Sequence, residues 1–217
     1  MKLPSLRSAE DVRNLVDELG LIPLFRSDVP GFSVEELTPE EYWFKDGVEG
    51  PWEWREQLAA SGEVAYAKLF ANKAGFVSRA LYPRFCNMRR EGYDFDARAE
   101  DGLVSARERK LYALVEGGLS LAHELRSAYG DKGFESAVTR LQMRTYIAVA
   151  GFDRRRDRYG VPYGWGISMY RTAEAQFGAL CASAYGEAPE ESRERIVETL
   201  EKNMSRADAE RLIAYKG

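Results

Sequence analysis

The strongest structural signal in the sequence is a run of three predicted helices between residues 105 and 145, which two β-prone segments follow. A capping box, Ser105-Ala-Arg-Glu108, begins the first helix, because its side chains can bond to backbone amides that a helix start leaves free. The second helix is expected from Leu121 to Tyr129. The third begins near Gly133, and its apolar stripe is expected to be buried; the stripe consists of Phe134, Val138 and Leu141.

Two strands are predicted after the third helix. Tyr146–Phe152 is rich in β-prone residues, Arg154–Gly160 is polar and typical of a turn, and Tyr163–Tyr170 returns as a second strand. Three helices followed by a two-stranded ribbon is the order of the winged helix-turn-helix, a variant of the motif whose recognition helix enters the major groove of DNA. We therefore expect a winged-helix domain over residues 105–171, with a ribbon that touches the DNA backbone.

The region before this domain, residues 1–104, is predicted to be an α/β region with a β-hairpin. Val64–Phe70 and Gly75–Ser78 are β-prone and flank the turn residues Asn72 and Lys73. Residues 172–217 carry helical apolar stripes and are predicted to be a C-terminal helical extension. The expected fold class is α+β and rich in helix.

Two shorter segments of the first region are interpreted from their local pattern. Trp52-Glu53-Trp54 alternates like a short strand, which would place both indoles on one face. Gly92–Gly102 is rich in aspartate and glycine, and we interpret it as a linker between domains.

Composition excludes several classes of enzyme. The chain has one histidine, His123, and two cysteines, Cys86 and Cys181, so it cannot supply the His and Cys clusters of zinc sites. It contains no glycine-rich phosphate loop, and we expect neither a metal nor a cofactor. No apolar stretch approaches the length of a membrane span, and the few cysteines fit a reducing cytoplasm.

Charge is distributed unevenly along the chain. The net charge is −4, yet residues 132–171 hold eight basic residues against three acidic ones. A single basic segment in an acidic chain is typical of a protein that offers one face to a polyanion, and double-stranded DNA is the expected partner. We expect phosphate contacts from the ribbon and groove contacts from the third helix; the residues are Arg154, Arg155, Arg156 and Arg158 in the ribbon, and Arg140, Gln142 and Arg144 in the helix. A candidate cleft is assigned to Asn72, Lys73 and Trp54.

The order of these motifs resembles the winged-helix DNA glycosylases of bacteria that excise alkylated or crosslinked bases. The segments that carry the resemblance are Lys132–Ala137, Tyr146–Gly151, the ribbon with Arg171–Glu174, Glu18–Phe25, and Val64–Ser78 with Tyr82-Pro83. The resemblance implies the architecture and the binding of nucleic acid. It also implies a bacterial protein, which would associate with the nucleoid in the cytoplasm if it binds DNA.

The chain departs from the family at its catalytic signature. That signature is a Gln-x-Asp or Gln-x-Gln pair after a Leu-Gly step, and here Leu19-Gly20 is followed by Pro23 and Phe25 at the corresponding positions. Asn72 stands where the family has a histidine. Neither proline nor phenylalanine can accept a proton or orient a water. We therefore expect a related DNA-binding protein without glycosylase activity. Pro23 and Phe25 should pack in the apolar contact between the first helix and the Trp52–Trp54 segment. Placement of Phe25 in an open polar cleft beside several carboxylates would remove the main support for inactivity.

Two alternatives stay open. One is an active DNA glycosylase that uses another carboxylate, such as Asp153 or one within residues 94–101. The other is a protein-interaction scaffold whose winged helix never touches DNA, which the net negative charge would allow. The oligomeric state and the base preference do not follow from the sequence.

Overall fold

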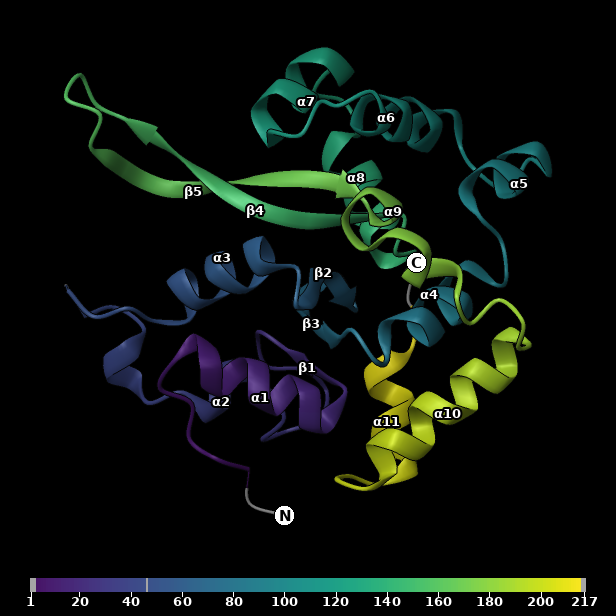
Figure 1. Cartoon of the computed structure of the whole chain (residues 1–217), viewed down its shortest axis with the longest axis horizontal. Helices are drawn as coiled ribbons and strands as arrows, with labels where there is room; N and C mark the ends of the chain where they lie inside the picture. Colours follow the sequence, from purple (N-terminus) through teal and green to yellow (C-terminus); the bar gives the residue numbers. More distant parts are fainter. Residues whose placement is uncertain (1–2, 46, 216–217) are drawn as a thin grey trace.

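The computed structural model describes residues 3–45 and 47–215. In this part of the chain the fold is α+β, with a three-stranded and a two-stranded antiparallel sheet among helices (Figure 1). The first elements are α1 (Ala9–Leu19), β1 (Leu21–Pro23), α2 (Val34–Leu37), the 3-10 helix η1 (Glu40–Tyr42), α3 (Pro51–Ser61), β2 (Val64–Phe70), β3 (Lys73–Ser78) and α4 (Tyr82–Arg90). The middle elements are α5 (Phe95–Glu100), α6 (Ala106–Glu116), α7 (Ala122–Tyr129), α8 (Phe134–Met143), β4 (Ile147–Arg156) and β5 (Pro162–Thr172). The last are α9 (Ala173–Phe177), the 3-10 helix η2 (Gly178–Ala182), α10 (Pro189–Glu201) and α11 (Arg206–Ile213).

The three-stranded sheet has the order β1-β3-β2 and contains the predicted hairpin. Its turn is formed by Ala71 and Asn72, which both have positive φ angles, 45° and 68°. Asparagine tolerates this left-handed conformation better than most residues do, which suits it to a tight turn. The hairpin expected around Asn72 is confirmed.

The predicted strand at Trp52–Trp54 is wrong, because these residues lie in the first turns of α3. Pro51 occupies the start of the helix, where its missing N–H costs nothing. The Glu53 side chain accepts a hydrogen bond of 3.0 Å from the backbone N–H of Gly50 and completes the helix start. These helix-start signals outweigh the short alternation of the indoles.

The interpretation of Gly92–Gly102 as a plain linker is also wrong. Asp94 accepts a hydrogen bond from the Ala97 N–H at 2.8 Å and begins α5. The Phe95 ring stacks on Tyr112 of α6 with 3.6 Å between centroids. The segment therefore belongs to the core of the helices that follow it.

Two apolar clusters hold the molecule together. One lies within residues 95–147 and contains Phe134, Val138 and Leu141, which are all buried as predicted. The other joins α1, the three-stranded sheet and α4 to α9, α10 and α11. The C-terminal helices therefore share a core with the N-terminal region, and Asn87 of α4 reinforces this contact by donating hydrogen bonds to Ala184 O at 3.1 Å and Ser192 Oγ at 2.9 Å.

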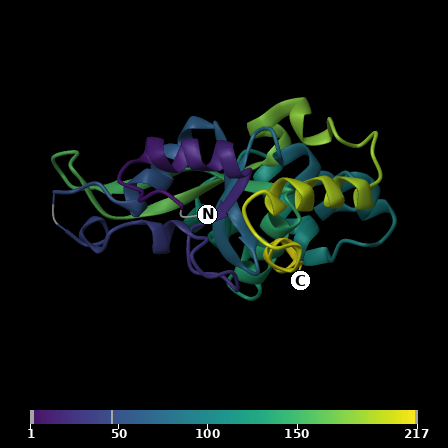
Figure 2. The ribbon, with the colours of Figure 1, turned by 90° about the horizontal axis from the view of Figure 1, so that it is seen from below.

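Strands β4 and β5 form a long ribbon whose free end projects beyond the body (Figure 1). The strands pair as far as Arg156 opposite Pro162, so the turn is shorter than predicted and Arg154–Arg156 are strand residues. The turn is tight because the Asp157 carboxylate accepts hydrogen bonds from the Tyr159 and Val161 N–H groups, at 2.8 and 2.9 Å. Viewed from below, the ribbon end lies at the opposite end of the molecule from α10 and α11 (Figure 2).

The base of the ribbon rests on α3. The two elements approach so closely at Gly166 that an added Cβ would stand 2.5 Å from Glu56 Oε1. Only glycine allows this approach without displacing the Glu56 side chain. Among the described helices, none has both the length and the apolar character that crossing a membrane requires.

Candidate nucleic-acid interface

The outer half of the ribbon carries exposed arginines. Arg155, Arg156 and Arg158 are exposed, and no carboxylate of the described residues forms a salt bridge with them. Arg156 donates to Gly160 O at 3.1 Å, and Arg158 lies over the Tyr159 ring at 4.7 Å. The Asp157 carboxylate accepts the N–H groups of the turn and forms no salt bridge with these arginines, so it offsets their three positive charges only in part.

Arg154 differs from its neighbours. Its guanidinium is 3.0 Å from Glu56 Oε2 and 3.6 Å from Glu53 Oε1, both on α3. The prediction that Arg154 contacts phosphate is therefore corrected: the side chain already has two carboxylate partners inside the protein.

Exposed aromatic side chains follow the arginines around the turn and onto β5, where Tyr163 lies opposite Arg155. Tyr159, Tyr163 and Trp165 are large and exposed, and Trp165 leaves 71% of its surface in contact with solvent. Trp165 also packs edge-on against Trp52 of α3, with 5.6 Å between ring centroids. Exposed aromatics beside cations are typical of surfaces that bind single-stranded nucleic acid, where rings stack on bases and arginines pair with phosphates.

The side chains of α8 are less available than predicted. Arg140 pairs with Glu108 at 3.3 Å and donates to Ser136 Oγ at 2.6 Å. Arg144 is 3.9 Å from Glu91 and lies over the Tyr215 ring at 5.1 Å. Both arginines are half-buried, so α8 presents little free positive charge.

The prediction that Gln142 contacts the groove of DNA is corrected. Its side chain is only 1% exposed, and its Oε1 accepts a 3.0 Å hydrogen bond from the Lys68 N–H at the edge of β2. Its amide also donates to Val138 O at 3.4 Å. A buried amide that supports the sheet cannot reach the edge of a base without breaking these bonds, so Gln142 is a structural residue here.

A cationic cavity of about 310 Å³ lies between the three-stranded sheet, α8 and the base of the ribbon. Its charged lining residues are Arg55, Lys68 and Lys73, and no carboxylate of the described part of the chain lines it. Asn72 lies beside Lys73 at its rim, so two of the three predicted cleft residues share a cavity. Trp54, the third, is 2% exposed and belongs to the core; its assignment to the cleft is wrong.

Neutral hydroxyl groups complete the lining of the cationic cavity. Burial raises the pKa of the Tyr66 phenol, and the nearby Arg55 guanidinium only partly offsets this. Burial likewise raises the pKa of Tyr170 to about 12. Both phenols therefore keep their protons near neutral pH and can donate hydrogen bonds, so the cavity offers cations and donors suited to phosphate or carbonyl oxygens.

Phe25 separates the cationic cavity from a second one. The ring centroids of Phe25 and Trp52 are 5.9 Å apart, so the expected contact is present. However, Phe25 also lines a cavity of about 470 Å³ that contains Glu35, Glu36 and Glu40. The expectation that Phe25 lies only in an apolar contact is therefore wrong, and the loss of the family's polar pair no longer argues by itself against chemistry.

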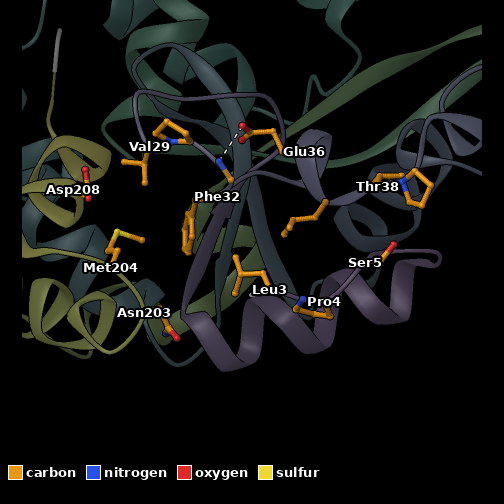
Figure 3. A pocket seen from close by; sticks show the side chains of 14 residues that line it. Leu3, Pro4, Ser5, Val29, Phe32, Glu36, Thr38, Asn203, Met204 and Asp208 are labelled. Carbon is orange, nitrogen blue, oxygen red and sulfur yellow. Dashed lines mark hydrogen bonds between the residues drawn. The ribbon is translucent and has the colours of Figure 1, made fainter. Parts of the chain in front are cut away.

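A further cavity of about 700 Å³ lies away from the cationic surface, between residues 3–5, the segment around Phe32 and the loop before α11 (Figure 3). Its carboxylates are already bonded: Glu36 accepts from the Gly31 N–H at 2.9 Å, and Asp208 accepts from Ser205 Oγ at 2.6 Å. Among residues 3–45 and 47–215, no lysine or arginine lines it. This cavity therefore has the wrong charge for a polyanion.

The remaining candidates for catalysis are isolated. His123 is on the exposed face of α7, and Cys86 and Cys181 are buried in the core. Within residues 3–45 and 47–215, no three His, Cys, Asp or Glu side chains are grouped so that they could hold a metal ion.

Sequence reasoning missed Arg55, Lys68 and Tyr170 as members of the cationic cavity. Lys68 could have been found from the strand period, since it is the one charged residue of an otherwise apolar β2. Arg55 and Tyr170 carry no comparable signal, because they reach the cavity only through the packing of α3 against the ribbon.

Comparison with known proteins gives the family. No curated protein matches the chain. A solved structure that it resembles is the DNA glycosylase AlkZ of Streptomyces sahachiroi, with 13% identity and a TM-score of 0.48. The match covers 90% of this chain and 51% of the AlkZ chain, so this chain spans about half the length of that structure. The sequence model of a family described as AlkZ related matches residues 6–215. The family resemblance is thereby confirmed, and the chain belongs to the AlkZ-related family.

Proposed function

We propose that this chain binds double-stranded DNA through the outer half of the β4–β5 ribbon and the cationic cavity at its base. The observation that carries the proposal is the group of three exposed arginines, Arg155, Arg156 and Arg158, without carboxylate partners in the described chain. Three cations within four residues repel one another, and phosphates would neutralise them. The exposed aromatics of the ribbon, Tyr159, Tyr163 and Trp165, add apolar surface beside these cations.

The arrangement of α6, α7, α8 and the ribbon supports a winged helix-turn-helix over residues 105–171 as the DNA-binding unit. In this motif the third helix approaches the major groove and the ribbon follows the backbone. Here the ribbon holds the free charge, whereas the arginines of α8 are paired with Glu108 and Glu91. We infer that contacts with the backbone dominate and that discrimination between sequences is weak.

We propose further that binding occurs without excision of a base. Pro23, buried in β1 opposite Gly75, and Phe25 have no group that can activate water, and this loss counts here only together with the bonds that already hold two of the three carboxylates beside Phe25. A second candidate is an active glycosylase that uses a carboxylate beside Phe25. The place of Glu35, Glu36 and Glu40 favours it, although Glu35 pairs with Arg26 at 3.5 Å and Glu36 accepts from Ser33 Oγ at 2.6 Å.

Salt-dependent binding to a random duplex tests the main proposal. We compare the wild type with Arg155→Ala/Arg156→Ala/Arg158→Ala by fluorescence anisotropy at several salt concentrations. Each lost phosphate contact should reduce the slope of log K against log[salt] by about 0.9, so the triple variant should lose about two to three.

The matched control is Arg193→Ala/Lys202→Ala/Arg211→Ala, which removes the same charge from α10 and α11, at the other end of the molecule (Figure 2). Its slope should stay near that of the wild type. If the wild type does not bind even at low salt, the DNA proposal is wrong and the scaffold alternative replaces it. If both triple variants lose affinity equally, the ribbon is not the interface.

A base-release assay on an alkylated duplex separates the two candidates. The wild type should release no base above the rate of the duplex alone. Release that Glu40→Gln abolishes, with DNA binding intact, would instead establish the enzyme and assign the carboxylate.

A further inference from the structure

Three cationic side chains line the cationic cavity, and no carboxylate of the described chain forms a salt bridge with any of them; they are Arg55, Lys68 and Lys73. We propose that the cationic cavity binds a phosphate monoester, the doubly charged group that a nucleoside monophosphate and a DNA end share. For a DNA end, the inference rests on the proposed DNA binding and names the part of the DNA that this cavity takes. For a free nucleotide, it does not depend on DNA binding.

The two lysines keep their charge and most of their hydrogen-bond donors. Lys68 Nζ donates to Thr139 Oγ1 at 3.2 Å, and Lys73 Nζ donates to Arg26 O at 2.6 Å. Both acceptors are neutral, so they orient the ammonium groups without neutralising them. An ammonium group has three N–H donors, and two on each lysine therefore remain for a ligand.

Aromatic rings hold Arg55 in place. Its guanidinium lies 4.6 Å from the ring centroids of both Trp52 and Phe152. It also hydrogen-bonds to the Tyr66 hydroxyl, whose own proton stays free for another acceptor. Ring contacts leave a guanidinium fully charged, and a side chain that is already held loses little conformational freedom when an anion binds. Arg55 is therefore a preorganised cation in the wall of the cavity.

Neutral donors surround the three cations. The phenols of Tyr66 and Tyr170 stay protonated near neutral pH, because burial raises the pKa of both, to about 12 for Tyr170. The Asn72 amide adds two N–H donors at the rim. These cations and donors come from α3, from both strands of the β2–β3 hairpin and its turn, and from β5, so they surround one space.

A monoester matches this lining better than a backbone diester does. A phosphate monoester carries nearly two negative charges at pH 7 and has three terminal oxygens that accept hydrogen bonds. A diester within a strand has one charge and only two such oxygens, so it would use fewer of the cations and donors. The exposed arginines of the ribbon suit the diesters of a DNA backbone. The cavity, walled by the sheet, α8 and the ribbon, suits a chain end.

The first test compares three compounds with the same base and sugar: 2′-deoxyadenosine, its 5′-monophosphate, and its 3′,5′-cyclic monophosphate, which is a diester. Each is titrated into the full chain while NMR signals of the protein are followed. The 5′-monophosphate should bind at least about tenfold more tightly than the nucleoside, since only the phosphate forms charge-assisted hydrogen bonds. It should also bind more tightly than the cyclic diester. Equal binding of monoester and diester, or no binding of the 5′-monophosphate, would overturn the proposal.

Variants place the phosphate in the cationic cavity. Lys68→Gln/Lys73→Gln removes two of the three charges and should weaken binding of the 5′-monophosphate at least about tenfold. Lys73→Gln alone should weaken it about threefold, and it should not unfold the protein, because Lys73 is exposed. The matched control, Lys132→Gln/Lys202→Gln, removes the same charge at exposed positions outside the cavity and should leave the affinity unchanged. An equal loss in the control would mean that only the net charge attracts the phosphate and that the site is wrong.

A nicked duplex identifies the source of the monoester. Two duplexes are identical except that one has a 5′-phosphate at the nick and the other a 5′-hydroxyl. Tighter binding of the phosphorylated nick, lost in Lys68→Gln/Lys73→Gln, would assign the cavity to DNA ends. Equal binding of the two duplexes, with binding of the free 5′-monophosphate, would assign it to a nucleotide; both results support the proposal. If neither duplex binds and the 5′-monophosphate does, the proposed DNA binding fails and the cavity proposal stands, so the two can fail separately.

Discussion

Arg154 of β4 and Glu56 of α3 form an ion pair, 3.0 Å long, across the contact between ribbon and helix. The neighbouring Arg55 strengthens this contact, because its guanidinium lies 4.6 Å from the ring centroids of both Trp52 and Phe152. The base of the ribbon is therefore held by charge and by stacking. Beyond Arg154, the ribbon has exposed arginines and no such support.

The first prediction concerns this ion pair. Glu56→Gln removes one of the two carboxylates that neutralise Arg154 and should make its guanidinium available to phosphate. DNA binding should become tighter at low salt, and the slope of log K against log[salt] should become steeper by up to about 0.9. Fluorescence anisotropy across a salt series measures both. Glu198→Gln, the same change of charge at an exposed position on α10, should leave the slope unchanged. An equal response to both substitutions would mean that only the net charge matters.

The second prediction distinguishes structure from recognition at Gln142. Gln142→Leu leaves the buried Lys68 N–H without its acceptor, which should lower the free energy of unfolding by about 1–3 kcal/mol. Chemical denaturation measures this loss, and Gln57→Leu, at an exposed position of α3, should change stability by less than about 0.5 kcal/mol. A folded variant with unchanged stability and altered base preference would return Gln142 to the interface.

The third prediction concerns the core of α6, α7 and α8. Leu141 is buried in this cluster, so Leu141→Ala should lower the free energy of unfolding by about 2–5 kcal/mol through lost burial and a residual cavity. Leu103 is half exposed, and Leu103→Ala should cost no more than about 0.5 kcal/mol. Similar losses in the two variants would show that the helices do not pack in this register.

The fourth prediction concerns the stability of the protein at low pH. The hydrogen bond from Arg206 lowers the pKa of the Glu194 carboxyl, so the folded protein binds this proton less tightly than the unfolded chain does. The pair therefore stabilises the contact between α10 and α11 above the ordinary carboxyl pKa, and the contribution is lost as the pH falls through the lowered pKa. Denaturation of wild type and Arg206→Gln should differ near pH 7 and converge on acidification. A difference that stays constant from pH 7 to pH 3 would contradict this.

The local signals in the sequence were sufficient for several elements. The capping box at Ser105 and the apolar spacing of Phe134, Val138 and Leu141 predicted α6 and the buried face of α8, and both are present. Asn72 predicted the turn of the β2–β3 hairpin. These features depend on residues within a few positions of one another, where backbone sterics and hydrogen bonding act without the rest of the chain.

Short segments with competing signals were predicted less well. Trp52 and Trp54 alternate like strand residues, yet Pro51 and the Glu53 side chain begin a helix there. Gly92–Gly102 looks like a linker, yet Asp94 caps a helix that Phe95 fixes to the core. In both segments a helix cap outweighed a weak pattern.

Sequence by itself thus determined which residues are basic, which stretches form helices and strands, and to which family the chain is related. Only the tertiary structure decided which of those residues are available. Arg154, Arg140 and Gln142 are as polar as Arg155, but carboxylates or backbone groups distant in the chain occupy them, at Glu56, Glu108 and Lys68 respectively. The same packing places Phe25 in the lining of both the cationic cavity and the cavity that contains Glu35, Glu36 and Glu40. Hydrogen bonds and ion pairs act over a few ångströms in space, and the distance along the chain between two partners does not reveal that they meet.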